Sequence, residues 1–266
     1  MSKRLKDKVA LVTGCGSSGP GWGNGKTMAV LFAREGARVF GCDIHLAAAQ
    51  ETRLAAASEG AEMEVAACDV ADDAQVAAMV AQCVARHGRI DVLVNNVGIV
   101  NLGGVVECTL DAWQKAWAVN VTSMFLTCKH VVPHMQRQGG GSIVNIGSVA
   151  GIRDSGVAYV AYSTTKAATL GLSRSVALQY SAQNIRSNVI LPGLMHTPMV
   201  AEPLKAGYGT ATLDAMLDKR RQQCPMGRMG DAWDVAHAAL WLASDESQYV
   251  SAAEIVVDGG LTAKFA

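Results

Sequence analysis

Short runs of β-branched residues alternate with longer apolar segments of helical period, and this alternation limits the fold more than any single motif. The first unit comprises a strand at residues 9–13, a glycine-dense loop at 14–25, a helix at 26–34 and a strand at 38–42 that ends at Asp43. Such strands are apolar on both faces. They predict a parallel sheet that helices cover on both sides, with right-handed crossovers.

The same alternation continues along the rest of the chain. Helices are predicted near 46–58, 74–87, 110–137, 159–180 and 233–243, and strands near 64–67, 92–95, 142–146, 187–191 and 254–257. The chain has 266 residues, of which 50% are hydrophobic, so it can bury a substantial core. We expect an α/β fold with one doubly wound parallel sheet of the Rossmann type, a single domain over 1–266. The irregular stretch at 192–225 is too long for a plain connector, so a substrate lid is expected near 193–225.

The glycine-dense loop follows the first strand, where backbone N–H groups and a helix N-terminus can approach a pyrophosphate. Gly14, Gly23 and Gly25 would leave room for that approach, although a tight turn without a ligand has a similar composition. Asp43 can accept both hydroxyls of an adenosine ribose, and it repels a 2′-phosphate. Its alternative role is the N-cap of the helix that begins at Leu46.

Charge and cysteine content narrow the function classes. The 23 basic and 23 acidic residues cancel and are interspersed, which argues against nucleic-acid, membrane-surface or acidic-tail functions. The seven cysteines are scattered without a C-x-x-C pair, and neither a signal peptide nor a run of 18 apolar residues is present. We therefore expect a protein of the reducing cytoplasm whose partners are a small-molecule substrate and copies of itself.

Tyr162 and Lys166 stand four residues apart in an Ala-rich segment, so they would lie one turn apart on one helix face. The ammonium favours phenolate over phenol and is expected to lower the pKa of Tyr162 toward working pH. Tyr162 would then be an acid or base for an alcohol proton. Ordinary surface pairs share this spacing, so the pair gains its meaning from the motifs around it.

Several motifs follow one another in the order and spacing of a known family, the short-chain dehydrogenases/reductases, which the sequence resembles from Leu5 to Leu261. They are Thr13-Gly14 with a later Gly-x-Gly, Asp69-Val70, Asn95-Asn96-Val97-Gly98, Tyr162-x3-Lys166, Pro192-Gly193 and Val257-Asp258-Gly259-Gly260. The enoyl reductase branch of that superfamily also has extended glycine loops. It separates its Tyr and Lys by more residues, however, than this chain does.

The resemblance implies a catalytic tetrad. Asn120 matches the helix Asn that holds a water in a proton relay, and Ser148 matches the Ser that hydrogen-bonds the substrate oxygen. Tyr162 matches the proton-transferring Tyr, and Lys166 the Lys that lowers its pKa and binds the nicotinamide ribose. Tyr159 is the rival Tyr, but no Lys follows it at the required spacing. Without the resemblance, Ser148 and Asn120 would more often be turn or capping residues.

The resemblance also implies a nicotinamide dinucleotide, and it assigns contacts to that cofactor. Asp69 and Val70 would flank the adenine, and Asn96 and Gly98 the adenosine ribose. Asp69 has an alternative role as the N-cap of the helix that begins near residue 72 or 73. The remaining expected contacts come from the glycine loop and from the segment after the sixth strand, namely Gly14, Gly23, Asn24, Gly25, Pro192, Gly193, Leu194 and Thr197.

Cofactor choice follows from the residues around Asp43. Family members that use the phosphorylated cofactor commonly place a basic residue before the middle glycine or just after the acidic position, and this chain has Trp22 and Ile44 there. NAD is therefore favoured. Between Gly14 and Gly23 lie eight residues instead of the usual three, so the segment 15–22 contains an insertion and the phosphate contacts stay open.

Three further groups of residues have two readings each. His130 and His134 have a metal-compatible spacing, but Pro133 lies between them and no third ligand is nearby, so no metal site is expected. His196 could reach the substrate or face solvent. A set of apolar residues could line a pocket for an apolar or cyclic substrate or form ordinary packing: Val100, Ile152, Leu194, Met195, Met199 and Leu204.

We predict an NAD-dependent oxidoreductase that converts a secondary alcohol to its ketone. One alternative is an NADPH-dependent reductase of 3-oxoacyl thioesters, which Asp43 disfavours. Another is a non-catalytic NAD-binding scaffold, which the intact tetrad disfavours. The resemblance further implies a homotetramer, in which the long helices carrying Asn120 and Tyr162 pair across a subunit interface.

Overall fold

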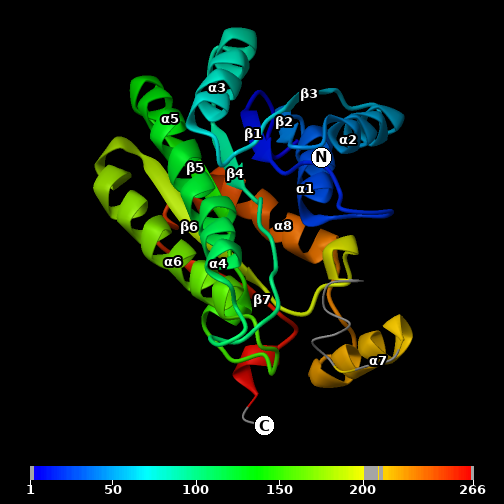
Figure 1. Ribbon diagram of the computed structural model, residues 1–266. Coiled ribbons are helices and arrows are strands. Elements are labelled where there is room, and N and C mark those ends of the chain that lie inside the picture. The colour runs from blue at the N-terminus through cyan, green and yellow to red at the C-terminus, as the bar shows by residue number, and fades with distance from the viewer. Residues whose placement is uncertain (1–2, 201–208, 210–211, 265–266) are drawn as a thin grey trace.

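A seven-stranded parallel sheet forms the centre of the protein in the computed structural model, which describes residues 3–200, 209 and 212–264 (Figure 1). Its spatial order is β3-β2-β1-β4-β5-β6-β7, and every neighbouring pair is parallel. The strands are β1 (Val9–Thr13), β2 (Arg38–Asp43), β3 (Met63–Ala67), β4 (Val92–Asn95), β5 (Gly141–Ile146), β6 (Ile185–Pro192) and β7 (Glu254–Val257). The predicted doubly wound α/β fold is confirmed.

Helices cover both faces of the sheet (Figure 1). One layer contains α1 (Asn24–Arg34), α2 (Leu46–Ser58) and α8 (Ala232–Ala243), and the other contains α3 (Asp73–His87), α5 (Ser123–Gln138) and α6 (Val160–Tyr180). The chain also forms α4 (Leu110–Trp117) and α7 (Leu213–Gln223). In the described part of the chain, no helix has both the length and the apolar composition needed to cross a membrane.

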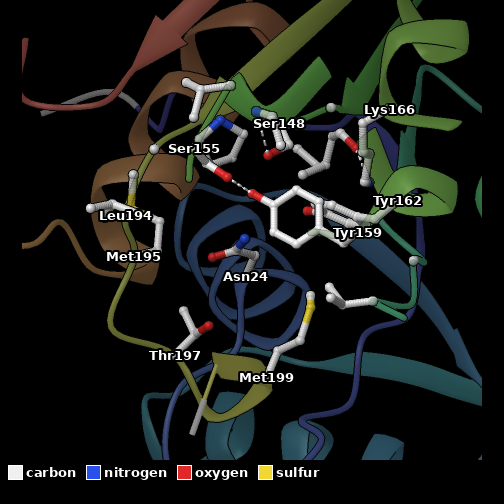
Figure 2. A pocket seen from close by; sticks show the side chains of 18 of the residues that line it. Asn24, Ser148, Ser155, Tyr159, Tyr162, Lys166, Leu194, Met195, Thr197 and Met199 are labelled. Atoms are coloured by element: carbon white, nitrogen blue, oxygen red, sulfur yellow. Dashed lines mark hydrogen bonds between the residues drawn. The ribbon is translucent and has the colours of Figure 1, made fainter. Parts of the chain in front are cut away.

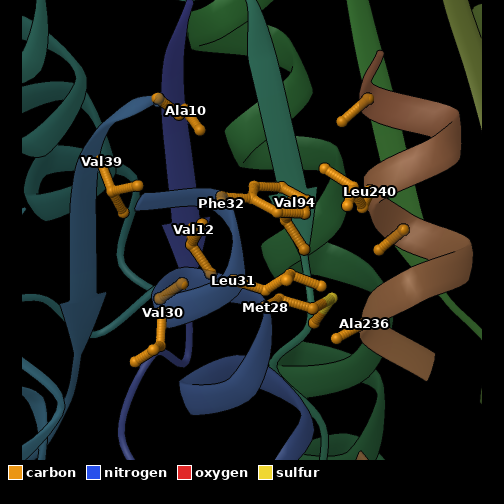
Figure 3. Close-up of a cluster of buried hydrophobic side chains, with 14 of the residues drawn as sticks. Ala10, Val12, Met28, Val30, Leu31, Phe32, Val39, Val94, Ala236 and Leu240 are labelled. Carbon is orange, nitrogen blue, oxygen red and sulfur yellow. The ribbon is translucent and has the colours of Figure 1, made fainter. Parts of the chain in front are cut away.

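The strands supply both hydrophobic layers because their side chains alternate between the two faces. Ala10 and Val12 of β1 join a buried cluster with Met28 and Phe32 of α1 (Figure 3). Side chains of α8, which covers the same face of the sheet, complete this cluster. Their neighbours Val9 and Leu11 join the opposite cluster, which includes side chains of α3 and α5. The two-sided burial inferred from the apolar strands is therefore present.

Two predicted elements differ from the structure. The helix expected at 110–137 is two helices, α4 and α5, joined by a π-helical segment, Ala118–Thr122, with Asn120 at its centre. The stretch read as irregular contains α7, which starts at the side-chain cap that Thr212 provides to the Ala215 N–H. Residues 201–208 and 210–211 of the predicted lid, including Leu204, lie outside the described residues.

The strand order reverses between β1 and β4, and ligands of doubly wound sheets bind outside the carboxyl ends of the strands at such a point. Side chains tie these two strand ends together. The Thr13 hydroxyl donates to the Val94 carbonyl at 3.0 Å, and the Asn96 Nδ2 donates to the Gly14 carbonyl at 3.0 Å. The glycine loop and the turn after β4 therefore share one rim of the cleft.

Candidate active site

A mainly apolar cavity of about 120 Å³ opens at this edge of the sheet, and it brings together ten of the predicted site residues. Because one water fills roughly 10–15 Å³ on this measure, the cavity has room for a small organic molecule. Figure 2 shows the side chains that line it, which come from the ends of β5 and β6, the start of α6 and the start of α1. The ten are Asn24, Asn96, Gly98, Ser148, Tyr162, Lys166, Pro192, Gly193, Leu194 and Thr197.

Ser148 and Tyr162 both line the cavity (Figure 2). Ser148 follows β5, and its Oγ accepts the Ala150 N–H at 3.2 Å, which starts a short 3-10 turn. Its hydroxyl also lies close enough to the phenol of Tyr162, in the first turn of α6, to favour the phenolate. This turn and the helix start place a serine hydroxyl and a phenol beside the same small volume.

The predicted direction of the Tyr162 pKa shift is wrong. Burial is the largest influence and raises the pKa of Tyr162, because a phenolate loses solvation in the protein interior. The nearby Ser148 hydroxyl and the positive charge of Arg220 act in the opposite direction but do not outweigh burial. The sequence shows which charge is near Tyr162, but it does not show how deeply the phenol is enclosed.

Lys166 is almost completely enclosed, with 4% of its surface exposed. Its Nζ donates to the Ile146 carbonyl at 2.8 Å and lies 5.8 Å from the centroid of the Tyr162 ring. Burial lowers the pKa of Lys166 to about 8, because the ammonium loses most of its solvation. The Tyr-x3-Lys spacing thus produces the predicted neighbours, with an ammonium that loses its proton more readily than usual.

Asn120 lies behind the cavity wall rather than in it. Its Oδ1 accepts the Ile99 N–H at 2.8 Å, and its Nδ2 donates to the Ile99 carbonyl and to the Thr165 hydroxyl. The side chain therefore holds the segment after β4 against α6, next to Lys166. The π-helical segment around it is a local interruption of helix geometry of the kind often found at functional sites. Its role as a water ligand stays a prediction.

The inserted loop at 15–22 is anchored at both ends. The Cys15 N–H donates to the Cys42 carbonyl at 2.9 Å, and the Gly16 N–H donates to Asp43 Oδ2 at 3.0 Å. At the other end, Trp22 packs on Trp233 of α8, with ring centroids 5.1 Å apart. The insertion thus forms an ordered flap beside the first turn of α1.

The glycines that follow β1 are required by close contacts. A Cβ at Gly25 would lie 1.8 Å from the Gly14 carbonyl oxygen, so α1 can approach the strand end only with glycine there. Gly14 itself has a φ of +62°, which favours glycine. Gly23 is the N-cap of α1. The backbone therefore comes as close to the cleft as a pyrophosphate site requires.

Asp43 is not the N-cap of α2, because His45 occupies that position. Its carboxylate instead accepts two backbone N–H groups, from Gly16 at 3.0 Å and from His45 at 3.0 Å. A carboxylate has about four lone-pair sites, so two remain for donors such as ribose hydroxyls. Ile44, beside it, is 60% exposed and uncharged.

Asp69 and Val70 follow β3 and lie outside the main cavity. The alternative reading of Asp69 as a helix N-cap is wrong, because Asp72 caps α3 by accepting the Gln75 N–H at 3.0 Å. Asp69 Oδ1 accepts the Ala71 N–H instead. The Val70 side chain is 5% exposed. Their contacts with adenine stay predictions.

Asn24 provides the observation that best fits a dinucleotide in this cleft. It is the first residue of α1 and lines the cavity (Figure 2). Its Oδ1 is buried and has no hydrogen-bond partner in the described part of the chain. A buried amide oxygen is costly to leave unpaired. Together with the glycine approach and the lone pairs of Asp43, it makes the cleft suitable for a nicotinamide dinucleotide.

Sequence reasoning missed three polar residues of the cavity: Ser155, Tyr159 and Arg220. The sequence offers Tyr159 only as a rival to Tyr162, yet the two rings pack edge-on with centroids 5.3 Å apart. Its phenol forms a hydrogen bond with the Ser155 hydroxyl (Figure 2). Arg220 lies on α7 and is 3% exposed. Thr212 is a recognisable N-cap that could have predicted α7, but it does not show that the Arg220 side chain lines the cavity.

The structure also gives the positions of the three histidines and of the predicted apolar lining. His196 is exposed and lines a separate groove beside Trp22, so its solvent-facing reading holds. His130 Nε2 lies 2.7 Å from Asp73 Oδ1. The described residues contain no group of three or more His, Cys, Asp or Glu that could hold a metal ion. Of the predicted apolar lining, Val100, Leu194, Met195 and Met199 border the cavity, whereas Ile152 packs in a separate cluster.

Known proteins resemble this chain along almost its full length. A family model described as Enoyl-(Acyl carrier protein) reductase matches residues 21–262. The 2-keto-3-deoxy-L-fuconate dehydrogenase of Xanthomonas campestris pv. campestris is 38% identical, over 97% of this chain and 81% of that protein. The 3-oxoacyl-(acyl-carrier-protein) reductase of Thermotoga maritima is 36% identical, over 97% of this chain and 99% of that protein.

A solved structure of a short-chain dehydrogenase/reductase from Burkholderia xenovorans is also similar. It superposes with a TM-score of 0.95 at 47% identity, covering 99% of this chain and 100% of that one. This superposition over nearly the whole of both chains agrees with the strand order described above. This chain therefore belongs to the short-chain dehydrogenase/reductase family and is an oxidoreductase.

Proposed function

We propose that this oxidoreductase oxidises a secondary alcohol to a ketone with NAD as the hydride acceptor. The observation that carries the proposal is that the Ser148 hydroxyl and the Tyr162 phenol lie beside each other in a small apolar cavity that Lys166 also lines. A hydroxyl donor beside a phenol can hold and deprotonate an alcohol oxygen. The predicted tetrad Asn120, Ser148, Tyr162 and Lys166 supplies the proposed catalytic groups.

The proposed steps follow from these side chains. Ser148 donates a hydrogen bond to the alcohol oxygen, and deprotonated Tyr162 accepts its proton. Bound NAD supplies a hydride acceptor at C4 of the nicotinamide and, in its oxidised form, a positive charge on that ring. Lys166 lines the cavity beside Tyr162 and would donate a hydrogen bond to the nicotinamide ribose. Ketone reduction uses the same groups in reverse.

The proposed cofactor contacts extend along the rim of the cleft. The backbone N–H groups of the glycine loop and of Asn24 would hold the pyrophosphate, and Asp43 would accept the adenosine ribose hydroxyls. The unpaired Asn24 Oδ1 would accept a hydrogen bond from a donor group of the cofactor. The nicotinamide end would lie beside Gly193, Leu194 and Thr197. The Asp43 carboxylate repels a 2′-phosphate, and the two positions where a basic residue could bind that phosphate hold Trp22 and Ile44. NAD is therefore the expected cofactor.

The test compares NAD with NADP. We expect NADH formation at mildly alkaline pH with at least one of a panel of secondary, cyclic and sugar alcohols and 3-hydroxyacyl thioesters. A preference for NADP with the thioesters would instead support the alternative activity, ketone reduction of 3-oxoacyl thioesters, for which the Thermotoga maritima relative is named. Binding of NAD without turnover on any substrate would support a non-catalytic scaffold.

We also propose a homotetramer that forms through α4, α5 and α6. Three large apolar side chains on these helices are exposed, Leu110 by 68%, Phe125 by 50% and Leu178 by 71%. An interface would remove them from water. Light scattering should give four times the 27.8 kDa mass of the chain, and Phe125→Glu should lower it. The seven free thiols support the proposed location in the reducing cytoplasm.

A further inference from the structure

A second pair of oxygen atoms faces the cavity beside the proposed reacting groups. The Ser155 hydroxyl and the Tyr159 phenol are hydrogen-bonded to each other, and both residues line the cavity (Figure 2). Both lie between Ser148 and Tyr162 in sequence, but they belong to neither the Tyr-x3-Lys motif nor the predicted tetrad. This pair is therefore a feature of the substrate wall of this chain.

The backbone holds both residues in place. Tyr159 is the residue that precedes α6, and it forms a bridge with Gly103, whose carbonyl accepts the Val160 N–H at 3.0 Å. Ser155 lies in a turn in which the Gly156 N–H donates to Asp154 Oδ1 at 2.9 Å. The Tyr159 ring is fixed further by its edge-on contact with Tyr162. The pair is thus positioned before any substrate arrives.

The surroundings of the pair are apolar. Val157, Leu194 and Leu261 form one hydrophobic cluster with Tyr159 and also border the cavity. A polar group that an apolar ligand covers in such a cavity is costly unless a partner satisfies it. A serine hydroxyl has one donor and two acceptor sites, so its bond with Tyr159 leaves Ser155 able to bind a further oxygen.

We propose that Ser155, held by Tyr159, binds a second oxygen of the substrate, so that the preferred substrate is a diol or hydroxy ketone rather than a monofunctional alcohol. This inference rests on the proposed function, because Ser148 and Tyr162 hold the reacting oxygen. The ring centroids of Tyr159 and Tyr162 are 5.3 Å apart, and both pairs line one small cavity, so one substrate could contact both. A site built to hydrogen-bond a hydroxyl discriminates against analogues that lack it.

The experiment measures kcat/KM with NAD for cyclohexanol and for cyclohexane-1,2-diol, -1,3-diol and -1,4-diol. We expect at least one diol to be preferred over cyclohexanol. Ser155→Ala should lower that diol-to-cyclohexanol ratio about tenfold, the effect of one lost hydrogen bond. Tyr159→Phe should lower the same ratio, because it releases the Ser155 hydroxyl from its fixed position. The isomer most sensitive to Ser155→Ala then reports the spacing of the two oxygens.

Two control variants make the same chemical changes on α6 outside the cavity. Ser175→Ala and Tyr180→Phe should leave the diol-to-cyclohexanol ratio as in the wild type. An unchanged diol-to-cyclohexanol ratio in Ser155→Ala, even if kcat/KM falls equally for both substrates, would overturn the second-oxygen site. It would leave the proposed function intact. Failure of the wild type to oxidise any of these alcohols or the wider panel would overturn both.

Discussion

At one end of the cleft Lys166 is 4% exposed and donates to a strand carbonyl, whereas at the other end Asp43 is only partly buried and accepts N–H groups from two loops. The first end, with Ser148 and Tyr162, is made of enclosed side chains on regular elements. The second, with the inserted loop at 15–22, is made of backbone and a carboxylate. Changes at the first end should alter the reaction, and changes at the second should alter cofactor recognition.

The largest expected effect comes from Lys166→Met. Removing the ammonium beside Tyr162 should lower kcat/KM by on the order of 10³-fold. The same change should stabilise the fold near pH 7. A pKa lowered from 10.5 to about 8 corresponds to roughly 3 kcal/mol of destabilisation below pH 8. Loss of the hydrogen bond to Ile146 offsets about 1 kcal/mol of the gain.

The stability difference has a defined pH dependence. Between pH 8 and 10.5 the unfolded wild type binds more protons at this lysine than the folded protein, so the Lys166 contribution to wild-type stability improves as pH rises. The advantage of Lys166→Met should therefore shrink across that window. Denaturant melts of both proteins at pH 7, 9 and 10.5 measure it. An advantage that is constant with pH would mean that Lys166 is not destabilised by burial.

Asp43→Asn tests the opposite end. The substitution keeps the shape of the side chain but removes the charge that repels a 2′-phosphate. We expect the ratio of kcat/KM with NAD to that with NADP to fall by at least about tenfold, with a smaller change in kcat. Initial rates with both cofactors measure this ratio. A fall in kcat that is equal for both cofactors would place Asp43 with the reacting groups and break the comparison.

Gly16→Ala sharpens the role of the inserted loop. A Cβ at Gly16 would meet the Ala48 Cβ at 2.7 Å and Asp43 Oδ2 at 2.9 Å, so the loop must move away from Asp43. We expect KM for NAD to rise about threefold to tenfold while kcat changes less. Gly19→Ala in the same loop is the matched control, because a Cβ at Gly19 would contact only the Pro198 Cβ, at the ordinary distance of 3.5 Å. Equal effects of the two variants would argue against the Gly16–Asp43 contact.

The smallest expected effect concerns Arg220. Its positive charge lowers the pKa of Tyr162 against the larger effect of burial. Arg220→Met should therefore move the rising limb of the rate profile to higher pH by about half a pH unit, whereas Arg220→Lys keeps the charge. Because burial already raises the pKa of Tyr162, the profile of kcat/KM against pH must extend to about pH 11 to measure the shift. An identical profile in both variants would show that the charge does not reach the titrating group.

The comparison also explains what the sequence could predict. Strand and helix patterns and the Tyr162–Lys166 spacing are local, and the structure places them as predicted except in the helix expected at 110–137 and the irregular stretch at 192–225. The pKa of Tyr162 was predicted with the wrong sign because burial depends on segments distant in sequence. The same reason hid the burial of Arg220 beside the cavity. Ser155 lies only four residues before Tyr159, but neither residue belongs to a motif that marks it as a cavity residue. The π-helical turn at Asn120 has no sequence signature that periodicity detects.

The central claim is that Tyr162 carries the proton of the alcohol, and one comparison tests it directly. The measurement is the initial rate of NADH formation by wild type and Tyr162→Phe, together with NADH binding followed by fluorescence. We predict a loss of at least about 10³-fold in kcat with NADH affinity within about threefold of wild type. Turnover within tenfold of wild type in Tyr162→Phe, with the cofactor bound, would contradict the account.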